Sequence, residues 1–260
     1  MTDPGEPDRA EHYFSERPHA RPNRRELRFL YRGELLTFVV DTGVFASERL
    51  DPGTALLIEN LALSPTDRVL DLGCGWGAVG VAAARAVPRG EVVLTEVNRR
   101  AARLAEANLL RNSVRNAEVK VGPLFEPVAD RTFDVIASNP PYRAGRELIL
   151  DLLAQAPDHL APGGRLVLVG KGSQGIRFYQ DWLAAHWAPR VRVLARGSGY
   201  RVLEATRPGA ARERQAPREV LAEGVKNRRS LGRRPRAPAA GRGPSRAGRA
   251  PGNGTLNATG

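Results

Sequence analysis

Hydrophobic and polar residues alternate along the first element that the sequence pattern defines. Leu27, Phe29 and Tyr31 are separated by polar residues, and after an Arg-Gly pair a second apolar run follows at Leu35–Val40. Alternation with a period of two is typical of strands with one buried face, and a short turn containing glycine joins two such strands into a hairpin. We therefore predict a β-hairpin over residues 26–41.

Apolar runs of strand length then alternate with helix-like segments. The runs lie at residues 69–71, 92–95, 117–121, 133–138, 165–170, 190–195 and 200–205, and the helical patterns lie at residues 52–61, 78–86, 99–110, 147–159 and 174–186. Strands that alternate with helices predict an α/β fold with a doubly wound, mostly parallel, Rossmann-like sheet. The last two strands are joined by only a tight Gly-Ser-Gly turn, so one of them must run antiparallel.

The distribution of charge distinguishes the end of the chain from the rest. Residues 208–260 contain 12 Lys+Arg and 3 Asp+Glu, a net charge of +9, whereas the preceding 207 residues have a net charge of +3. These last residues are also rich in Pro, Gly, Ala and Arg. We predict an N-terminal extension with the hairpin (1–50), an α/β domain (51–207) and a disordered basic tail (208–260), which either attracts RNA or reflects compositional drift.

Composition also limits the class of protein. The longest apolar runs are too short to cross a membrane, residues 1–9 lack the apolar core of a secretion signal, and Cys74 is the single cysteine. These features predict a cytoplasmic protein without disulfides or membrane association. The four histidines are scattered without metal-ligand spacing, so we expect no metal site.

The segment Asp71–Gly80 reads Asp-Leu-Gly-Cys-Gly-Trp-Gly-Ala-Val-Gly and connects a predicted strand to a predicted helix. Its Gly73, Gly75 and Gly77 allow the backbone to approach a ligand at the carboxyl ends of the strands. Glu96 follows Gly75 by 21 positions, where an acid that binds ribose is expected. The glycine spacing fits a dinucleotide and S-adenosylmethionine equally well.

Asp71 favours S-adenosylmethionine. Its carboxylate, at the end of a strand and beside the glycine turn, would repel an anionic pyrophosphate in a partly desolvated site. A sulfonium ligand with a free ammonium group would instead be attracted. We therefore expect S-adenosylmethionine as the cofactor, with Glu96 accepting hydrogen bonds from the ribose hydroxyls.

A second motif, Asn139-Pro140-Pro141-Tyr142, follows the fourth predicted strand of the α/β pattern. Two adjacent prolines make the turn rigid and remove two amide donors, so the Asn139 carboxamide and the Pro140 carbonyl are left as acceptors. Two bonds accepted from an NH2 group would direct its lone pair toward a methyl donor, and Tyr142 would stack on a planar substrate. We assign Asn139, Pro140 and Tyr142 to catalysis of N-methyl transfer.

These motifs resemble the class I S-adenosylmethionine-dependent methyltransferases with an NPPY-type signature. The similarity extends to about residue 207 and includes His12-Tyr13-Phe14-Ser15, Gly43-Val44-Phe45, Asp51-x-Gly53-Thr54 and Gly199-Tyr200-Arg201-Val202. The Gly-Val-Phe segment is similar to the branch of small-subunit rRNA guanine-N2 methyltransferases and their compact single-domain relatives. The resemblance implies seven strands with the seventh antiparallel, an rRNA substrate, cofactor contacts from Asp71, Gly73, Gly75, Glu96 and Asn139, and Asn139–Tyr142 at the target nitrogen.

Two departures leave the substrate open. Many relatives have an acid after the third strand that hydrogen-bonds the adenine amino group, and Gly122-Pro123-Leu124 stands in its place here. The two-domain rRNA enzymes also have a further N-terminal domain, where this chain has the short extension.

Two alternatives to RNA methylation are therefore considered. Glutamine N5-methylation of a protein suits the same turn, although the Arg-Pro-acid segment of that family is missing. A non-catalytic RNA-binding or cofactor-binding module is disfavoured by the intact Asn139–Tyr142 turn.

Overall fold

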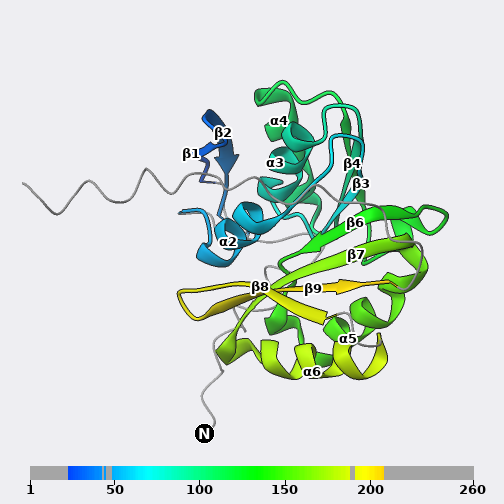
Figure 1. Cartoon of the computed structure of the whole chain (residues 1–260). Helices are drawn as coiled ribbons and strands as arrows, with labels where there is room; N and C mark the ends of the chain where they lie inside the picture. Colours follow the sequence, from blue (N-terminus) through cyan, green and yellow to red (C-terminus); the bar gives the residue numbers. More distant parts are fainter. Residues whose placement is uncertain (1–22, 43, 45–48, 188–190, 208–260) are drawn as a thin grey trace, which may run out of the picture. The chain divides into compact units, whose positions relative to one another are not determined.

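A sheet of seven strands is the centre of the computed structural model, which describes residues 23–42, 44, 49–187 and 191–207 (Figure 1). Its strands are β3 (Arg68–Leu72), β4 (Glu91–Glu96), β5 (Ala117–Val121), β6 (Phe133–Ser138), β7 (Leu160–Lys171), β8 (Val191–Gly197) and β9 (Tyr200–Thr206). Residues 1–22 of the predicted N-terminal extension (1–50), with their His-Tyr-Phe cluster, lie outside the described residues. The same holds for most of the Gly-Val-Phe loop and for the predicted tail at 208–260.

The strand order is β5-β4-β3-β6-β7-β9-β8. The pairs from β5 through β7 are parallel, and β9 runs antiparallel to both β7 and β8. The predicted doubly wound sheet with an antiparallel seventh strand is thus confirmed. The order reverses direction between β3 and β6, and in such sheets ligands bind outside the carboxyl ends of the strands at this reversal.

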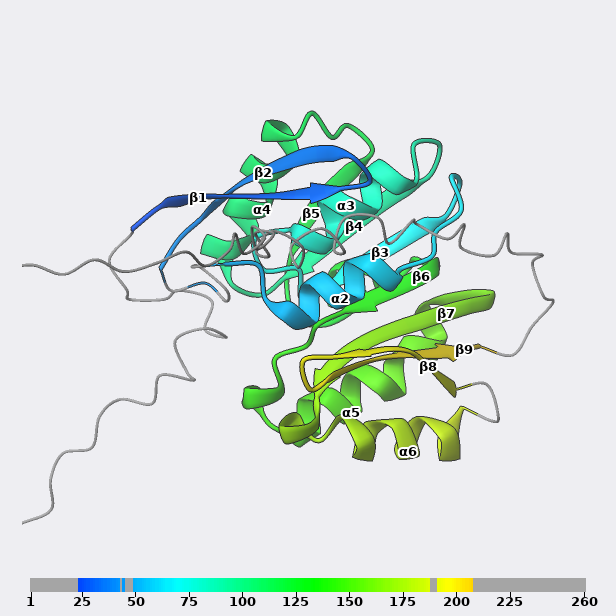
Figure 2. The same cartoon turned by 60° about the vertical axis from the view of Figure 1, so that its left-hand side comes forward.

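Helices cover both faces of the sheet (Figure 2). Helices α2 (Pro52–Asn60), α3 (Ala78–Ala86) and α4 (Arg99–Arg111) lie on one face, and α5 (Arg146–Gln155) and α6 (Ile176–His186) lie on the other. Each layer encloses its own apolar cluster, with α2, α3 and α4 contributing to one and α5 and α6 to the other. The small side chains of α3, among them Val81 and Ala83, are almost fully buried and allow this helix to lie close to the sheet.

The predicted hairpin is confirmed as β1 (Arg25–Tyr31) and β2 (Glu34–Val40), which pair antiparallel. It packs onto α4, because Asn108 donates from Nδ2 to the Val39 carbonyl oxygen (3.0 Å) and accepts at Oδ1 from the Val39 amide (2.7 Å). Asn112 makes the same pair of bonds with Thr37, at 2.8 and 3.0 Å. Phe38 is fully buried in the cluster under α3 and α4, so this hairpin shares the core of the α/β domain.

The predicted boundaries differ from the structure most around α5 and β7. The helix predicted to residue 159 ends at Gln155 and continues as a 3-10 turn over Ala156–His159. Pro157 has no amide to donate within an α-helix, and its ring clashes with the preceding turn. Strand β7 then begins at Leu160, earlier than predicted.

Candidate active site and cofactor cradle

The turn after β3 has the backbone geometry of a ligand cradle. Gly73 and Gly75 have φ angles of 73° and 57°, in the left-handed region that favours glycine. The amides of Gly73 and Cys74 both donate to the Thr95 carbonyl oxygen at 2.9 Å, which fixes the turn against the end of β4. A Cβ atom added at Gly73 or Gly75 would meet no atom within 4 Å. Open space therefore lies beside these two glycines, as binding of a cofactor along the turn requires.

Gly77 has a different structural reason to lack a side chain. It is the N-cap residue of α3 with a φ of 88°, and an added Cβ would lie 3.2 Å from Cβ of Ala105 and 3.4 Å from Cδ2 of Leu94. The close approach of α3 to α4 and β4 therefore requires glycine here. Packing accounts for Gly77, and its predicted contact with the cofactor stays a prediction.

Asp71, near the end of β3, is 2% exposed and accepts a 2.7 Å hydrogen bond at Oδ2 from the Gly80 amide in the first turn of α3. The pKa of this carboxyl is raised to about 7, because burial and the nearby Glu96 charge raise it by more than the bond from Gly80 lowers it. A cationic group placed beside Asp71 would favour the ionised form. Asp71, the predicted partner of the cofactor ammonium, thus also accepts a hydrogen bond from the N-terminal turn of α3.

Glu96, the last residue of β4, faces the glycine turn. Its Oε2 accepts from the Gly75 amide at 2.8 Å and its Oε1 accepts from the Asn98 amide at 2.9 Å. Burial raises the pKa of Glu96, and the backbone bonds from Asn98 and Gly75 lower it. Each carboxylate oxygen has more than one acceptor position, so these bonds leave capacity for the ribose hydroxyls predicted to bind here.

The Asn-Pro-Pro-Tyr motif follows β6, the neighbour of β3 in the sheet. Ser138, fully buried, donates from Oγ to the Leu72 carbonyl oxygen (2.8 Å) and so ties the start of the motif to the end of β3. The Pro140 carbonyl oxygen, predicted as an acceptor for substrate, already accepts from the Tyr142 amide at 2.9 Å. It keeps a second lone pair, and the bond tightens the turn that presents Asn139.

The Asn139 side chain has partners that the sequence argument did not anticipate. Its Nδ2 donates to Oγ1 of Thr54 at 2.9 Å and to Oδ2 of Asp51 at 3.1 Å. Asp51 also caps α2, because it accepts from the Thr54 amide at 2.9 Å. In the sequence, the Asp-x-Gly-Thr segment is linked to Asn139 only through the family resemblance.

Tyr142 is half-buried, and its hydroxyl donates to the Val169 carbonyl oxygen at 2.8 Å. Its ring lies against Gly170 of β7 and near the ring of Tyr179, with a centroid separation of 5.7 Å. Desolvation raises the pKa of this phenol well above its usual value, so the hydroxyl stays protonated near neutral pH. The ring is therefore anchored at its hydroxyl end.

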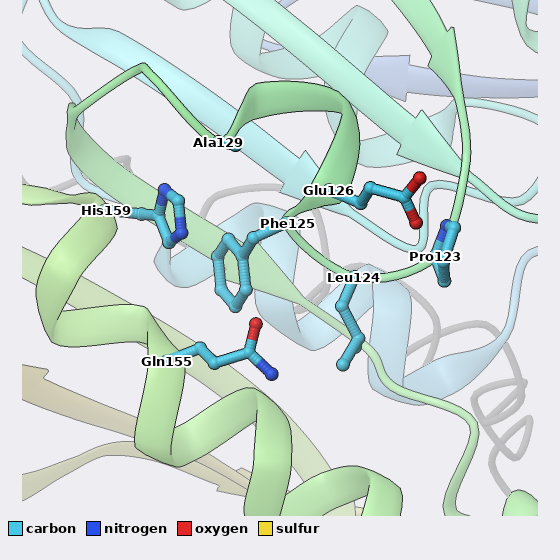
Figure 3. Close-up of a pocket in the computed structure, with 7 residues that line it drawn as sticks. All are labelled: Pro123, Leu124, Phe125, Glu126, Ala129, Gln155 and His159. Atoms are coloured by element: carbon cyan, nitrogen blue, oxygen red, sulfur yellow. The ribbon is translucent and has the colours of Figure 1, made fainter.

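The loop after β5, where many relatives have an acid for adenine, borders a hollow of about 340 Å³ (Figure 3). The hollow is lined by Pro123, Leu124, Phe125, Glu126, Ala129, Gln155 and His159. Phe125 is buried and stacks on the His159 ring at 4.4 Å between centroids. None of its lining residues belongs to the glycine turn or to Asn139–Tyr142, and we assign this hollow no part in methyl transfer.

The sheet order, the glycine cradle after β3, the acid ending β4 and the Asn-Pro-Pro-Tyr turn after β6 together define a class I S-adenosylmethionine-dependent methyltransferase. Residues 35–204 match the methyltransferase small domain family, and the chain belongs to that family. S-adenosylmethionine is its cofactor, and the buried acids and the open space at Gly73 and Gly75 fit such a ligand.

Similar proteins differ in how much of their length this chain covers. YbxB, an uncharacterized protein of Bacillus subtilis (strain 168), is 31% identical over 198 residues, which are 75% of this chain and 98% of that protein. A ribosomal RNA small subunit methyltransferase C of Pseudomonas syringae pv. syringae (strain B728a) is 35% identical over 66% of this chain and 52% of its own length.

Among solved structures, a T. thermophilus 16S rRNA N2 methyltransferase in complex with AdoMet and guanosine superposes with a TM-score of 0.63 and 28% identity. The match covers 71% of this chain and 50% of that chain. The chain thus spans about half the length of the rRNA methyltransferases that it matches.

In the part of the chain that the structure describes, no helix is long and apolar enough to cross a membrane. Within the same residues, no group of three or more His, Cys, Asp or Glu side chains is placed to hold a metal ion.

Proposed function

We propose that this protein methylates the exocyclic N2 nitrogen of a guanine in small-subunit rRNA. The two rRNA methyltransferases named above are 35% and 28% identical to this chain in the matched regions, and the one with a solved structure has the same fold. The T. thermophilus relative was solved with guanosine, a nucleoside whose base carries an exocyclic NH2 group.

The orientation of the Asn139 carboxamide is the observation that carries the proposal. Because Nδ2 donates to Thr54 and Asp51, the carbonyl oxygen Oδ1 is the end left to face a substrate. A carbonyl oxygen accepts a hydrogen bond from an NH2 group, and the Pro140 carbonyl can accept a second. Two such bonds pyramidalise the nitrogen, so that its lone pair leaves conjugation with the base and points toward an electrophile.

The chemistry needs little beyond this positioning. S-adenosylmethionine supplies an activated methyl group when it is bound. Asp71 and Glu96 would hold its ammonium and ribose ends beside the glycine turn, while Asn139 and Pro140 hold the nucleophile. The target nitrogen would gain positive charge as its bond to the methyl carbon forms and the carbon–sulfur bond breaks, and the acceptor oxygens would stabilise that charge most strongly in the transition state. The methylated nitrogen would then release one of its protons to water.

The test compares acceptors that differ only at the target. The protein is incubated with methyl-labelled S-adenosylmethionine and small ribosomal subunits, naked rRNA, or total cell protein. RNA oligonucleotides spanning the labelled segment are then made with guanosine or with inosine, which lacks the N2 amino group. Label in rRNA and in the guanosine oligonucleotide, but not in the inosine one, supports the proposal. Label in protein glutamine, or equal labelling of the inosine oligonucleotide, contradicts it.

A further inference from the structure

Asp51 connects three separate parts of the fold at the methyl-transfer motif. Its Oδ2 accepts from the Asn139 Nδ2 after β6, at 3.1 Å, and from the Thr54 amide of α2, at 2.9 Å. Its Oδ1 accepts from the Tyr200 hydroxyl at the start of β9, at 3.0 Å. Both carboxylate oxygens are therefore used, and one of their donors is Asn139, the side chain that the proposed function places at the target nitrogen.

The hydrogen positions in this cluster are mutually consistent. Thr54 Oγ1 accepts from Asn139 Nδ2 at 2.9 Å and has its own hydrogen directed to Oδ2 of Asp51 at 3.4 Å. The Asn139 amide nitrogen thus has an acceptor for each of its two hydrogens. A flipped carboxamide would place its Oδ1 against the Asp51 carboxylate, where two acceptors repel each other. The negative charge of Asp51 therefore selects the orientation of Asn139.

Tyr200 fixes Asp51 in turn. The Tyr200 ring packs on the first turn of α2, where a Cβ atom added at Gly53 would lie 2.5 Å from Cε1 of the ring. The Lys171 ammonium lies over the same ring, 5.4 Å from its centroid. Gly53 is thus required for the close contact that brings the phenol to Asp51.

We propose that Asp51, supported by Thr54 and Tyr200, is a positioning residue for methyl transfer that acts through Asn139. It holds the carboxamide with Oδ1 toward the substrate. Its negative charge behind the amide nitrogen also polarises the carbonyl, so that Oδ1 accepts more strongly as the target nitrogen becomes positive. The inference rests on the role that the proposed function gives to Asn139, but not on the identity of the RNA.

The first test uses turnover. Asp51→Asn should lower kcat about tenfold to a hundredfold, less than the hundredfold or greater loss expected from removing an acceptor at the reacting atom itself. Tyr200→Phe and Thr54→Val should lower kcat about threefold to tenfold, and Thr54→Ser should restore it. KM for the RNA and Kd for S-adenosylmethionine should stay within about twofold. Glu59→Gln removes the same charge from an exposed position on the same helix and should change nothing.

A double-mutant cycle separates action through Asn139 from an independent effect on the fold. In the Asn139→Ala background, Asp51→Asn should cause no further loss of kcat, because the group through which it acts is gone. Multiplicative losses would overturn the proposal. Melting temperatures identify any variant that is not folded, and Tyr200→Phe, which loses a single hydroxyl, then carries the test.

A second measurement does not depend on the substrate. The side-chain amide of Asn139, identified by NMR through its loss in Asn139→Ala, should exchange slowly with solvent in the full-length protein. Its exchange should become at least tenfold faster in Asp51→Asn and remain unchanged in Glu59→Gln. Fast exchange in the unmodified protein would overturn the inference even if guanine were methylated. Slow exchange in a protein that leaves guanine unlabelled would uphold the positioning of Asn139 and contradict the proposed substrate.

Discussion

The carboxyl group of Asp71 combines burial with a place beside the predicted ammonium of the cofactor. At a pKa of about 7 it is only partly ionised in the cofactor-free protein near neutral pH. An ammonium group favours the carboxylate, so binding should release a proton. A single residue therefore links cofactor affinity to pH.

We predict that affinity for S-adenosylmethionine rises between pH 5.5 and 7.5, by up to about tenfold per pH unit below the Asp71 pKa. The range stops there because α-amino groups themselves deprotonate near pH 7.7–8.0. Calorimetric titration at several pH values measures the slope, and Asp71→Asn should bind more weakly with a flat profile. Methylthioadenosine lacks the ammonium group, so its affinity should depend on pH in the same way in the unmodified protein and in Asp71→Asn. An equal slope for both ligands would contradict the assignment.

The raised pKa of Asp71 also affects stability. As pH rises, cofactor affinity should increase, whereas the free energy of unfolding of the cofactor-free protein should decrease. An acid whose folded-state pKa is raised from 3.8 to about 7 makes the free energy of unfolding fall as pH rises through that window. Asp71→Asn removes this loss and still offers an acceptor to the Gly80 amide. We expect the cofactor-free variant to melt at a higher temperature than the unmodified protein at pH 8, and the difference should shrink toward pH 4.

Tyr142 gives a second prediction at the residue scale. Tyr142→Phe keeps the ring and loses the bond to Val169, which costs about 0.5–1.5 kcal/mol of stability and should leave most activity. Tyr142→Ala removes the stacking face and should raise KM for the RNA at least tenfold. Gly170→Ala should resemble Tyr142→Ala, because its new methyl group overlaps the Tyr142 hydroxyl. Steady-state kinetics distinguish the three; full activity in Tyr142→Ala would remove Tyr142 from the site.

Among the elements, the three strands at one edge of the sheet share an ionic cluster in which Arg165 and Glu204 are buried and Arg192 is exposed. Glu204 of β9 accepts from Nη1 of Arg165 in β7 at 2.9 Å and from Nε of Arg192 in β8 at 3.0 Å. The Arg165 and Glu204 side chains are 3% and 5% exposed. Removing one partner of such a pair leaves a buried charge without compensation, whereas removing both does not.

Glu204→Leu is therefore expected to lower the free energy of unfolding by about 3–5 kcal/mol, and Arg165→Met combined with Glu204→Leu should recover most of that loss. Urea denaturation of both variants and the unmodified protein gives these values. Arg28→Met, which removes an exposed pair with Glu26, is the matched control and should cost no more than about 1 kcal/mol. A double variant less stable than Glu204→Leu would contradict the argument.

At the scale of the whole molecule, the net charge of +9 in residues 208–260 bears on RNA affinity. If its arginines meet RNA phosphates, a chain ending at Arg207 should bind RNA more weakly. The slope of log affinity against log salt should then fall by about 0.7 per lost contact for single-stranded RNA. Preference among sequences should persist, because phosphate contacts carry no base information. Equal slopes with and without these residues would show that they are not used in binding.

Most secondary-structure elements and turns of this protein are determined by local sequence alone. Periodicity placed the hairpin and the alternating strands and helices, the glycines after β3 indicated a turn that a ligand can approach closely, and the short Gly-Ser-Gly connection required an antiparallel strand. These features depend on a residue and its near neighbours in the chain. The Asn-Pro-Pro-Tyr turn belongs to the same class, since prolines restrict the backbone wherever they occur.

Only the tertiary structure decided what lies beside those local features. Asp51, Asn139 and Tyr200 are far apart in sequence and meet because β6, β7 and β9 are adjacent in the sheet and α2 packs on β7 and β9. The hairpin joins the core through Asn108 and Asn112 of α4, polar residues whose place on a helix gave no sign of a strand partner. The hydrogen-bond partners of a side chain and its burial depend on residues that are near in space but distant in sequence. The periodicity of the sequence does not indicate which residues these are.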